Sequence, residues 1–211
     1  MECLIRERER EFEFIDSLKC LECEQYVERF FMFSAAPVLT GAKPATLVSL
    51  KCGNRSAWMR HRERLEAATG LRAMELYEKC DRFALLIFDE RALDVRIRSP
   101  ASRTLLEAYG YSADDALEGL LLHLKSRFGA CKFPHEIGLF LGYPPRDVGT
   151  FIEKEGRDYL CCRHWKVYHD ERGARRLFKF IDDSKALAAT LLRKQVPICA
   201  VAQILAKAQN Y

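Results

Sequence analysis

Six apolar residues in a row, Phe83 to Phe88, lie between charged residues on both sides. A run of this length is typical of a strand that is buried on both of its faces. We therefore expect it to be the central strand of a small sheet. The apolar segments 46–50 and 71–77 predict two further strands. The segment 159–168 predicts another, because its apolar and polar side chains alternate near its end.

Most of the remaining chain has the spacing of amphipathic helices, with apolar residues three and four positions apart. Expected helices cover residues 1–33, 55–69, 100–110, 112–129, 133–142, 145–156, 170–181 and 185–211, the last interrupted at Pro197. The sequence thus predicts an α+β fold, a helix-dominated single domain over residues 1–184 with a small mixed β-sheet of three to five strands. Residues 185–211 are expected to form a C-terminal helical hairpin or extension.

The stretch 133–156 carries two consecutive helix-start signals, each a proline followed by an acidic residue in the first turn. These are Pro134 with Glu136, and Pro145 with Asp147. A glycine ends each segment. The stretch is therefore predicted to be a tight helical hairpin. The side chains that we expect to pack together in it are Ile137, Phe140, Leu141, Val148, Phe151 and Ile152.

The bulk composition argues against several classes of protein. Hydrophobic residues make up 49% of the chain, which is too many for an intrinsically disordered protein. The net charge of only +4 does not indicate a nucleic-acid partner. No apolar stretch of about 18 residues and no secretory signal is present, so we expect a cytoplasmic protein with no membrane partner. The nine cysteines are expected to be reduced thiols.

One set of motifs resembles a known family. It comprises the run Phe133 to Pro144 (FPHEIGLFLGYP), Asp147-Val148, Phe151-Ile152, Cys162, Trp165 to Tyr168 (WKVY), and the earlier Ala36 to Leu39, Lys43 to Ala45 and Gly110-Tyr111. Over roughly residues 35–180 the chain resembles the bacterial family catalogued as domain of unknown function 3793, found largely in anaerobes. The family usually has glycine and an aromatic residue after the matched cysteine, where this chain has Arg163 and His164. The resemblance implies no specific activity. It implies a bacterial cytoplasm and a metabolism linked to iron or flavodoxin.

The resemblance selects polar residues that neither helical period nor strand alternation explains. Five of them are candidates for a ligand-binding site: Lys43, His135, Glu136, Cys162 and Lys166. The helix expected to start near His135 offers free backbone N–H groups, and the two lysines would add positive charge. We therefore expect an anionic small molecule, phosphorylated or carboxylated, with Cys162 beside it as a thiol or metal ligand. No nucleotide-binding or serine-hydrolase motif is present, and the sequence identifies no cofactor.

Each candidate also has a structural interpretation, and these alternatives stay open. Glu136 is expected to help cap its helix and His135 to hydrogen-bond a carbonyl group. The lysines are expected to pair with surface acids or to lie along apolar surface. Cys20 and Cys23 have the spacing of half a zinc site, but no second spaced pair exists. We predict that they pack in the core instead, on the apolar side of the first helix.

Two other classes of function remain beside a ligand-binding protein or enzyme. The hairpin has the apolar spacing of a helix-turn-helix regulator. Its second helix carries Arg146 and Lys154, but Asp147, Glu153 and Glu155 balance them, and a helix that reads DNA should be basic. A non-catalytic adaptor that uses the C-terminal extension is the third class.

Overall fold

The computed structural model describes residues 11, 13–130 and 133–208. Its centre is a three-stranded antiparallel sheet of β1 (Ala45–Lys51), β2 (Arg72–Lys79) and β3 (Arg82–Phe88). The strand order is β1-β3-β2, so the apolar run in β3 forms the central strand, as predicted. A second sheet pairs the short strands β4 (Cys161–Cys162) and β5 (Lys166–Val167). Both sheets are antiparallel, where we expected a mixed sheet.

Helices make up most of the described chain, which confirms the predicted helix-dominated α+β class. Their bounds are α2 (Cys23–Leu39), α3 (Arg55–Thr69), α4 (Glu90–Ile97), α5 (Pro100–Glu107), α6 (Leu117–Ala130), α7 (Ile137–Phe140), α8 (Pro145–Glu153), α9 (Glu171–Arg193) and α10 (Ile198–Lys207). A short 3₁₀ helix, η1 (Cys52–Asn54), links β1 to α3.

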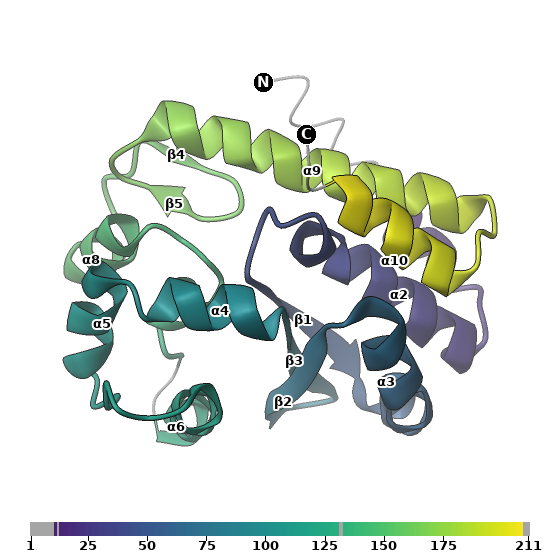
Figure 1. The fold of residues 1–211 in the computed structure, drawn as a ribbon, viewed down its shortest axis with the longest axis horizontal. Coiled ribbons are helices and arrows are strands. Elements are labelled where there is room, and N and C mark those ends of the chain that lie inside the picture. Colours follow the sequence, from purple (N-terminus) through teal and green to yellow (C-terminus); the bar gives the residue numbers. More distant parts are fainter. Residues whose placement is uncertain (1–10, 12, 131–132, 209–211) are drawn as a thin grey trace.

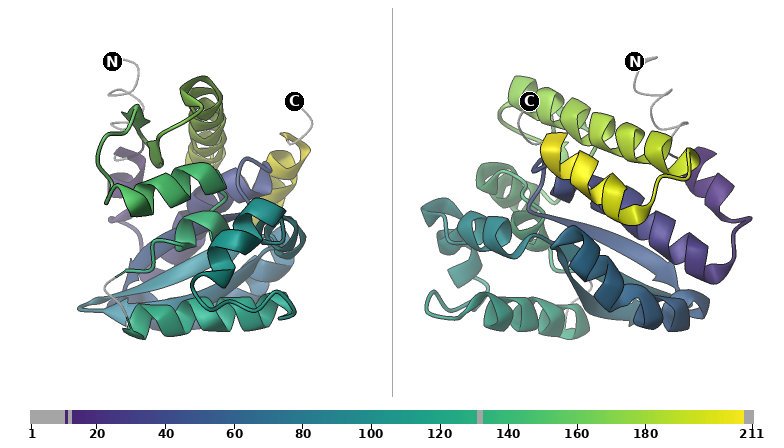
Figure 2. Two further views of the ribbon diagram at one scale, coloured as in Figure 1. Left: turned by 90° about the vertical axis from the view of Figure 1, so that its left-hand side faces the viewer. Right: turned by 45° about the vertical axis from the view of Figure 1, so that its right-hand side comes forward.

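Helices cover both faces of the three-stranded sheet (Figures 1 and 2). Phe83, Leu85 and Ile87 of β3 pack into a core with α2, α3, α9 and α10. Leu86 and Phe88 point to the opposite face and pack into a second core with helices α4 to α8. All five side chains are at most 6% exposed. Burial on both faces is the reason that the run is continuously apolar.

A third, smaller core joins the β4–β5 hairpin to α9. Trp165 and Val167 of the hairpin segment pack against Ala174, Phe178 and Ile181 of the helix. The helix then continues without a break past residue 184, where we expected the main domain to end. Its second half and α10 contribute to the first core, on the face of the sheet that α2 and α3 cover. The break at Pro197 before α10 is confirmed.

Several predicted boundaries are wrong. The helix expected over 133–142 is reduced to the four residues of α7. The N–H groups of Ile137, Gly138 and Leu139 bond carbonyls three residues back, so tight turns replace its first part. The strand expected over 159–168 consists of two short strands around a turn, because the side chains of that turn reach toward α9.

Two helices begin differently from the prediction. The helix expected from Ser112 starts at Leu117, because residues 112–116 form a turn in which the Ser112 hydroxyl accepts a hydrogen bond from a nearby backbone N–H. Helix α4 was not predicted. Its cap is visible in the sequence, since the carboxylate of Asp89 accepts a hydrogen bond from the N–H of Ala92 at 2.7 Å.

The N-terminal helix also differs. A turn at residues 19–22 precedes α2, and Cys20 and Cys23 beside it are exposed, so the prediction that they pack in the core is wrong. Phe12, part of the same pattern, lies outside the described residues. The helix also extends beyond the predicted range of 1–33, since α2 continues to Leu39 with Pro37 buried inside it. Burial of that last turn outweighs the proline's unfavourable effect on the helix.

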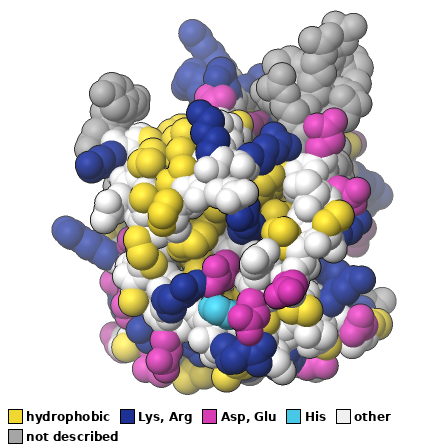
Figure 3. All heavy atoms as spheres, turned by 90° about the vertical axis from the view of Figure 1, so that its right-hand side faces the viewer, with side chains coloured by type: hydrophobic (Ala, Val, Ile, Leu, Met, Phe, Trp, Pro, Cys, Tyr) yellow, Lys and Arg dark blue, Asp and Glu magenta, His cyan; other side chains and the backbone are white. Residues whose placement is uncertain are grey.

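Charges of both signs mix on the side of the molecule where α3 lies. Figure 3 shows acidic and basic side chains around a histidine on this face, with hydrophobic side chains gathered above them. Ion pairs connect α3 to α2 here: Arg60 with Glu24 at 3.0 Å, and His61 with Glu28 at 2.9 Å. The exposed pair of Arg60 and Glu24 adds little stability.

Candidate ligand-binding site

The segment before α7, helix α8 and the β4–β5 hairpin enclose a cavity of about 300 Å³. Three of the five candidate residues, His135, Cys162 and Lys166, line it, although they come from separate parts of the chain. We call this space the Trp165 cavity. The rest of its wall is largely apolar or aromatic and includes Phe133, Ile137, Leu141, Tyr143, Val148, Phe151 and Trp165.

The buried carboxylate of Asp147 holds one side of the cavity together. This residue lies in the first turn of α8 and is 3% exposed. One oxygen accepts a hydrogen bond from the indole N–H of Trp165 at 2.9 Å. The other accepts from the backbone N–H groups of Tyr168 at 3.0 Å and His169 at 3.2 Å. Because all three donors belong to the hairpin segment, one side chain of α8 fixes where the hairpin lies.

Aromatic rings form a second part of the wall. The ring centres of Tyr143 and Trp165 are 5.1 Å apart and the rings are stacked, while Phe178 of α9 meets Trp165 edge-on at 4.5 Å. Arg96 of α4 positions this wall by donating to the carbonyls of Gly142 and Tyr143 at 3.0 and 3.3 Å. Burial raises the pKa of Tyr143 to about 12, so its phenol is neutral at physiological pH.

The turn between β4 and β5 is tied to α9 by a shared acid. The guanidinium of Arg163 lies 2.7 Å from one oxygen of Asp182, and Nε2 of His164 lies 3.0 Å from the other. The Arg163 and Asp182 side chains are only 8% and 9% exposed. Arg163 and His164 are the two positions where the chain departs from the resembled family, and neither was predicted to have a role. That departure was the available signal, since an arginine that is nearly buried needs an acidic partner.

Lys166 is held by contacts that leave its charge without an acidic partner. Its Nζ donates to the carbonyl of Gly156 at 2.7 Å and lies 4.9 and 5.7 Å from the ring centres of Tyr159 and Phe151. Among the described residues no carboxylate pairs with it. An ammonium group has three N–H donors, so two remain for a ligand.

His135 and Cys162 both present exposed side chains to the cavity. The imidazole of His135 lies 5.1 Å from the ring centre of Phe151 and 5.9 Å from that of Phe133. Over the described part of the chain it has no hydrogen-bond partner, so the expected bond to a carbonyl is not found. The neighbouring thiol of Cys161 is half-buried, and this burial raises its pKa.

Glu136 does not line the cavity. Its side chain is 1% exposed and turns into the second core, where the carboxylate accepts from Arg127 at 2.7 Å and from the hydroxyl of Tyr111 at 3.4 Å. It makes no capping hydrogen bond to α7, contrary to the structural expectation. A buried carboxylate needs a cationic partner more than the helix end needs a cap.

Lys43 also lies outside the cavity, but next to its wall. Its Nζ is 5.3 Å from the ring centre of Tyr143, which lines the cavity. The lysine therefore borders the site without facing the space that His135, Cys162 and Lys166 share.

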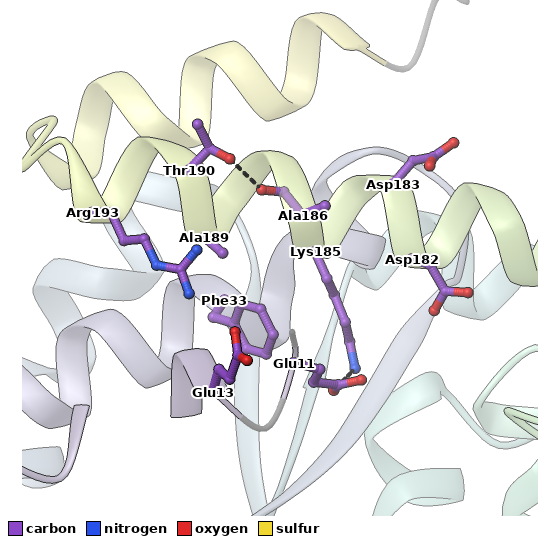
Figure 4. Close-up of a pocket in the computed structure, with 10 residues that line it drawn as sticks. All are labelled: Glu11, Glu13, Phe33, Asp182, Asp183, Lys185, Ala186, Ala189, Thr190 and Arg193. Carbon is purple, nitrogen blue, oxygen red and sulfur yellow. Dashed lines mark hydrogen bonds and ion pairs between the residues drawn. The ribbon is translucent and has the colours of Figure 1, made fainter. Parts of the chain in front are cut away.

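A second cavity, of about 370 Å³, lies between α9 and the N-terminal segment. Figure 4 shows Lys185 extending from α9 to meet Glu11, while Arg193 reaches toward the N-terminal segment about two turns further along the helix. The wall also includes Glu13 and Asp183. None of the predicted candidates lines this space, and its acids and bases are mixed, so we place the candidate site at the Trp165 cavity.

Two properties of the described residues bear on the class of site. Within residues 11, 13–130 and 133–208, no three His, Cys, Asp or Glu side chains are grouped so that they could hold a metal ion. In the same part of the chain, no helix combines the length and the apolar character that crossing a membrane requires.

Comparison with known proteins identifies the family. No curated protein and no solved structure matches the chain. The model of one protein family, described as protein of unknown function DUF3793, matches residues 31–202. This match includes every segment of the Trp165 cavity, all of α9 and the first half of α10, and so extends beyond the motifs that carry the resemblance. The chain therefore belongs to the DUF3793 family of proteins of unknown function.

Proposed function

We propose that the protein binds a small anionic molecule with a flat apolar body in the Trp165 cavity, in a bacterial cytoplasm. The observation that carries this proposal is the convergence of His135, Cys162 and Lys166 on one largely aromatic cavity. Ligand pockets are typically apolar with a few polar groups and have volumes of roughly 300–1,000 Å³. The Trp165 cavity is at the lower end of that range, which suits a ligand of one or two rings.

The charges in the wall favour an anion over a cation. Both oxygens of Asp147 already accept hydrogen bonds, and Asp182 behind the wall is shared by Arg163 and His164. A cationic ligand would therefore find no free carboxylate among the described residues of the wall. An anionic ligand would find the ammonium group of Lys166, which has donors to spare.

The alternative functions gain no support. A helix-turn-helix needs two regular helices, and α7 has four residues, all of them buried. For an adaptor, Val201, Ala202 and Leu205 of α10 are buried in the core with α2, α3 and α9, so only the outer side of the helix, where Ile204 is exposed, is free, and no observation points to a partner for it.

Tryptophan fluorescence tests the proposal, because one of the two tryptophans lines the cavity. Trp165 is in the wall of the cavity. Trp58 is buried in the first core, with α2, α3, α9 and α10, where it stacks on Phe31. In a Trp58→Phe variant the emission reports on the cavity alone. The aromatic sulfonate 1-anilinonaphthalene-8-sulfonate serves as the test ligand. We expect saturable quenching of Trp165 with one site per chain, and competition by anionic aromatic metabolites.

A pair of lysine variants then tests the charge. Lys166→Met removes the ammonium group in the wall, and we expect the dissociation constant of the sulfonate to rise about fivefold. Lys79→Met removes an exposed lysine at the end of β2 and is the matched control, with a change below about twofold. Equal effects of the two substitutions, or quenching that does not saturate, would contradict the proposal.

A further inference from the structure

Cys162 faces the Trp165 cavity because of its place in the β4–β5 hairpin. Its direct cross-strand partner is Lys166, and the neighbouring pair is Cys161 with Val167. Side chains alternate along a strand, so the two pairs leave the hairpin on opposite faces. Cys161 and Val167 pack into the core with α9, whereas Cys162 and Lys166 line the cavity. The register of the hairpin therefore places one thiol and one ammonium group on the wall together.

The thiol and the lysine are close neighbours. In an antiparallel pair, the Cβ atoms of directly opposite residues are about 4.5–5.5 Å apart. Cys162 is an exposed free thiol, and among the described residues it has no hydrogen-bond partner. Within the same part of the chain, Lys166 donates to a carbonyl and pairs with no acid. A ligand whose carboxylate binds Lys166 would therefore lie beside the sulfur atom of Cys162.

His135 adds an imidazole to the same space. Its ring and Nζ of Lys166 lie 5.1 and 5.7 Å from the ring centre of Phe151, so both are neighbours of one aromatic side chain. His135 is exposed, and no described residue hydrogen-bonds its ring. A neutral imidazole can accept a proton from a thiol and pass it to another atom. The cavity thus combines a nucleophile, a proton carrier and a group that binds anions.

We propose that the thiol of Cys162 adds to an α,β-unsaturated carbonyl compound that carries a carboxylate, and holds it as a thioether. This rests on the proposed function, because it names the class of anion that the Trp165 cavity binds. A conjugated C=C–C=O group is planar, so it fits against the stacked rings of Tyr143 and Trp165 as a flat apolar body does. Thiols are strong nucleophiles, and their addition to such a group releases no leaving group into the largely apolar cavity.

The reaction balances without an oxidant or a reductant. The sulfur lone pair of Cys162 attacks the β-carbon, a C–S bond forms, and the C=C π electrons move toward the carbonyl oxygen to give an enolate. The thiol proton passes to the imidazole of His135. It is then transferred to the α-carbon, which restores the carbonyl group and the neutral imidazole. Elimination of the thiol reverses each step.

Labelling with 3-benzoylacrylate tests the proposal on the intact chain. This probe has a phenyl ring, a conjugated carbonyl group and a carboxylate, and its methyl ester is the matched uncharged probe. Peptide mass spectrometry after short reaction times measures the labelled fraction of every cysteine. We expect Cys162 to react with benzoylacrylate at least about tenfold faster than the exposed Cys80 and Cys199, at a rate that saturates with probe concentration. Labelling of Cys162 no faster than that of Cys80 would overturn the proposal.

Two substitutions separate binding of the carboxylate from the chemical step. Lys166→Met should slow labelling of Cys162 by benzoylacrylate about fivefold, while the rate with the methyl ester changes less than about twofold. His135→Gln removes the proton carrier and should lower the saturated rate about tenfold. His61→Gln on α3, outside the cavity, is the matched control and should leave this rate unchanged. Equal slowing with both probes in Lys166→Met, or an unchanged saturated rate in His135→Gln, counts against the proposal.

The sulfonate distinguishes failure of the covalent step from failure of binding. It has no electrophilic carbon, so its quenching of Trp165 reports on binding alone. It should also protect Cys162 from benzoylacrylate, in proportion to the occupied fraction of sites, and leave Cys199 unprotected. Saturable quenching combined with labelling of Cys162 no faster than that of Cys80 overturns only the covalent step. Quenching that does not saturate contradicts the proposed function itself.

Discussion

The indole N–H of Trp165 donates a 2.9 Å hydrogen bond to the buried carboxylate of Asp147, so a wall residue of the cavity and the anchor of the hairpin form one unit. Asp147→Asn keeps the size of the side chain but points an amide N–H at a hydrogen-bond donor in either orientation. We expect the free energy of unfolding to fall by about 1–3 kcal/mol, measured by urea denaturation.

A double-mutant cycle isolates the contact between these two residues. Trp165→Phe removes the indole donor, and the combination with Asp147→Asn should destabilise by at least about 1 kcal/mol less than the sum of the single variants. The matched pair is Asp147→Asn with Trp58→Phe, which lies in another core and should be additive. Additivity in the first cycle would show that the bond contributes nothing to stability.

Adjacent aspartates in α9 should respond very differently to substitution. The side chain of Asp182 is only 9% exposed and is shared by Arg163 and His164, whereas Asp183 is exposed and pairs with the exposed Lys179. Asp182→Ala should lower the free energy of unfolding by about 2–3 kcal/mol, because it removes the acid from a buried cation. Asp183→Ala should cost less than about 0.5 kcal/mol. Thermal unfolding of both variants checks this, and a smaller effect at Asp182 would refute it.

Two glycines with the same backbone conformation differ in the space around them. Gly142 and Gly70 have φ values of +80° and +70°. A methyl group on Gly142 would lie 2.4 Å from Cδ of Pro44, whereas on Gly70 it would meet nothing within 4 Å. Gly70→Ala should therefore cost about 1 kcal/mol of backbone strain, and Gly142→Ala at least about 2 kcal/mol more. Equal midpoints in urea would show that the Pro44 loop moves freely.

The pKa of Lys43 makes stability depend on pH. In the folded protein this pKa is about 7, against 10.5 in the unfolded chain, so the unfolded state binds more protons between these values. The resulting destabilisation is present in full below pH 7 and is relieved as the pH rises toward 10.5. Because the residue is half-buried and not fully shielded from water, we expect wild type to gain only about 1 kcal/mol relative to Lys43→Met between pH 7 and pH 9.

Urea denaturation at both pH values measures this difference, with Lys79→Met as the control for loss of an ordinary lysine. Parallel pH dependence of wild type and Lys43→Met would contradict the lowered pKa.

The parts of the fold that sequence predicts best are those with one dominant cause. The run of β3 is apolar on both faces because both faces are covered, and Gly70 ends α3 because its φ is positive. The helix predicted over residues 133–142 was wrong because two effects compete there. Its proline and acid have the pattern of a helix start, but Glu136 is drawn into a buried ion pair with Arg127, which favours turns.

The site was predictable only as a set of segments. Polar residues without a periodic explanation pointed to His135, Cys162 and Lys166, and these do share a cavity. The sequence carried no sign that Glu136 turns into the core or that Lys43 lies behind Tyr143, since both depend on long-range packing. It likewise gave Asp147 only as a helix-start acid, although its three hydrogen bonds hold the hairpin.

The length and continuity of helix α9 have a mechanical consequence. Its 23 residues span roughly 35 Å. Phe178 packs against the hairpin near one end, and Leu192 is buried in the first core at the other end. We expect a continuous helix of this length to tilt as one rigid unit and not to bend at its middle. When a molecule enters the cavity and shifts the hairpin, the displacement should therefore emerge at the opposite end, where Val196 leads into α10. The packing of α10 against the core and the occupancy of the cavity should therefore influence each other.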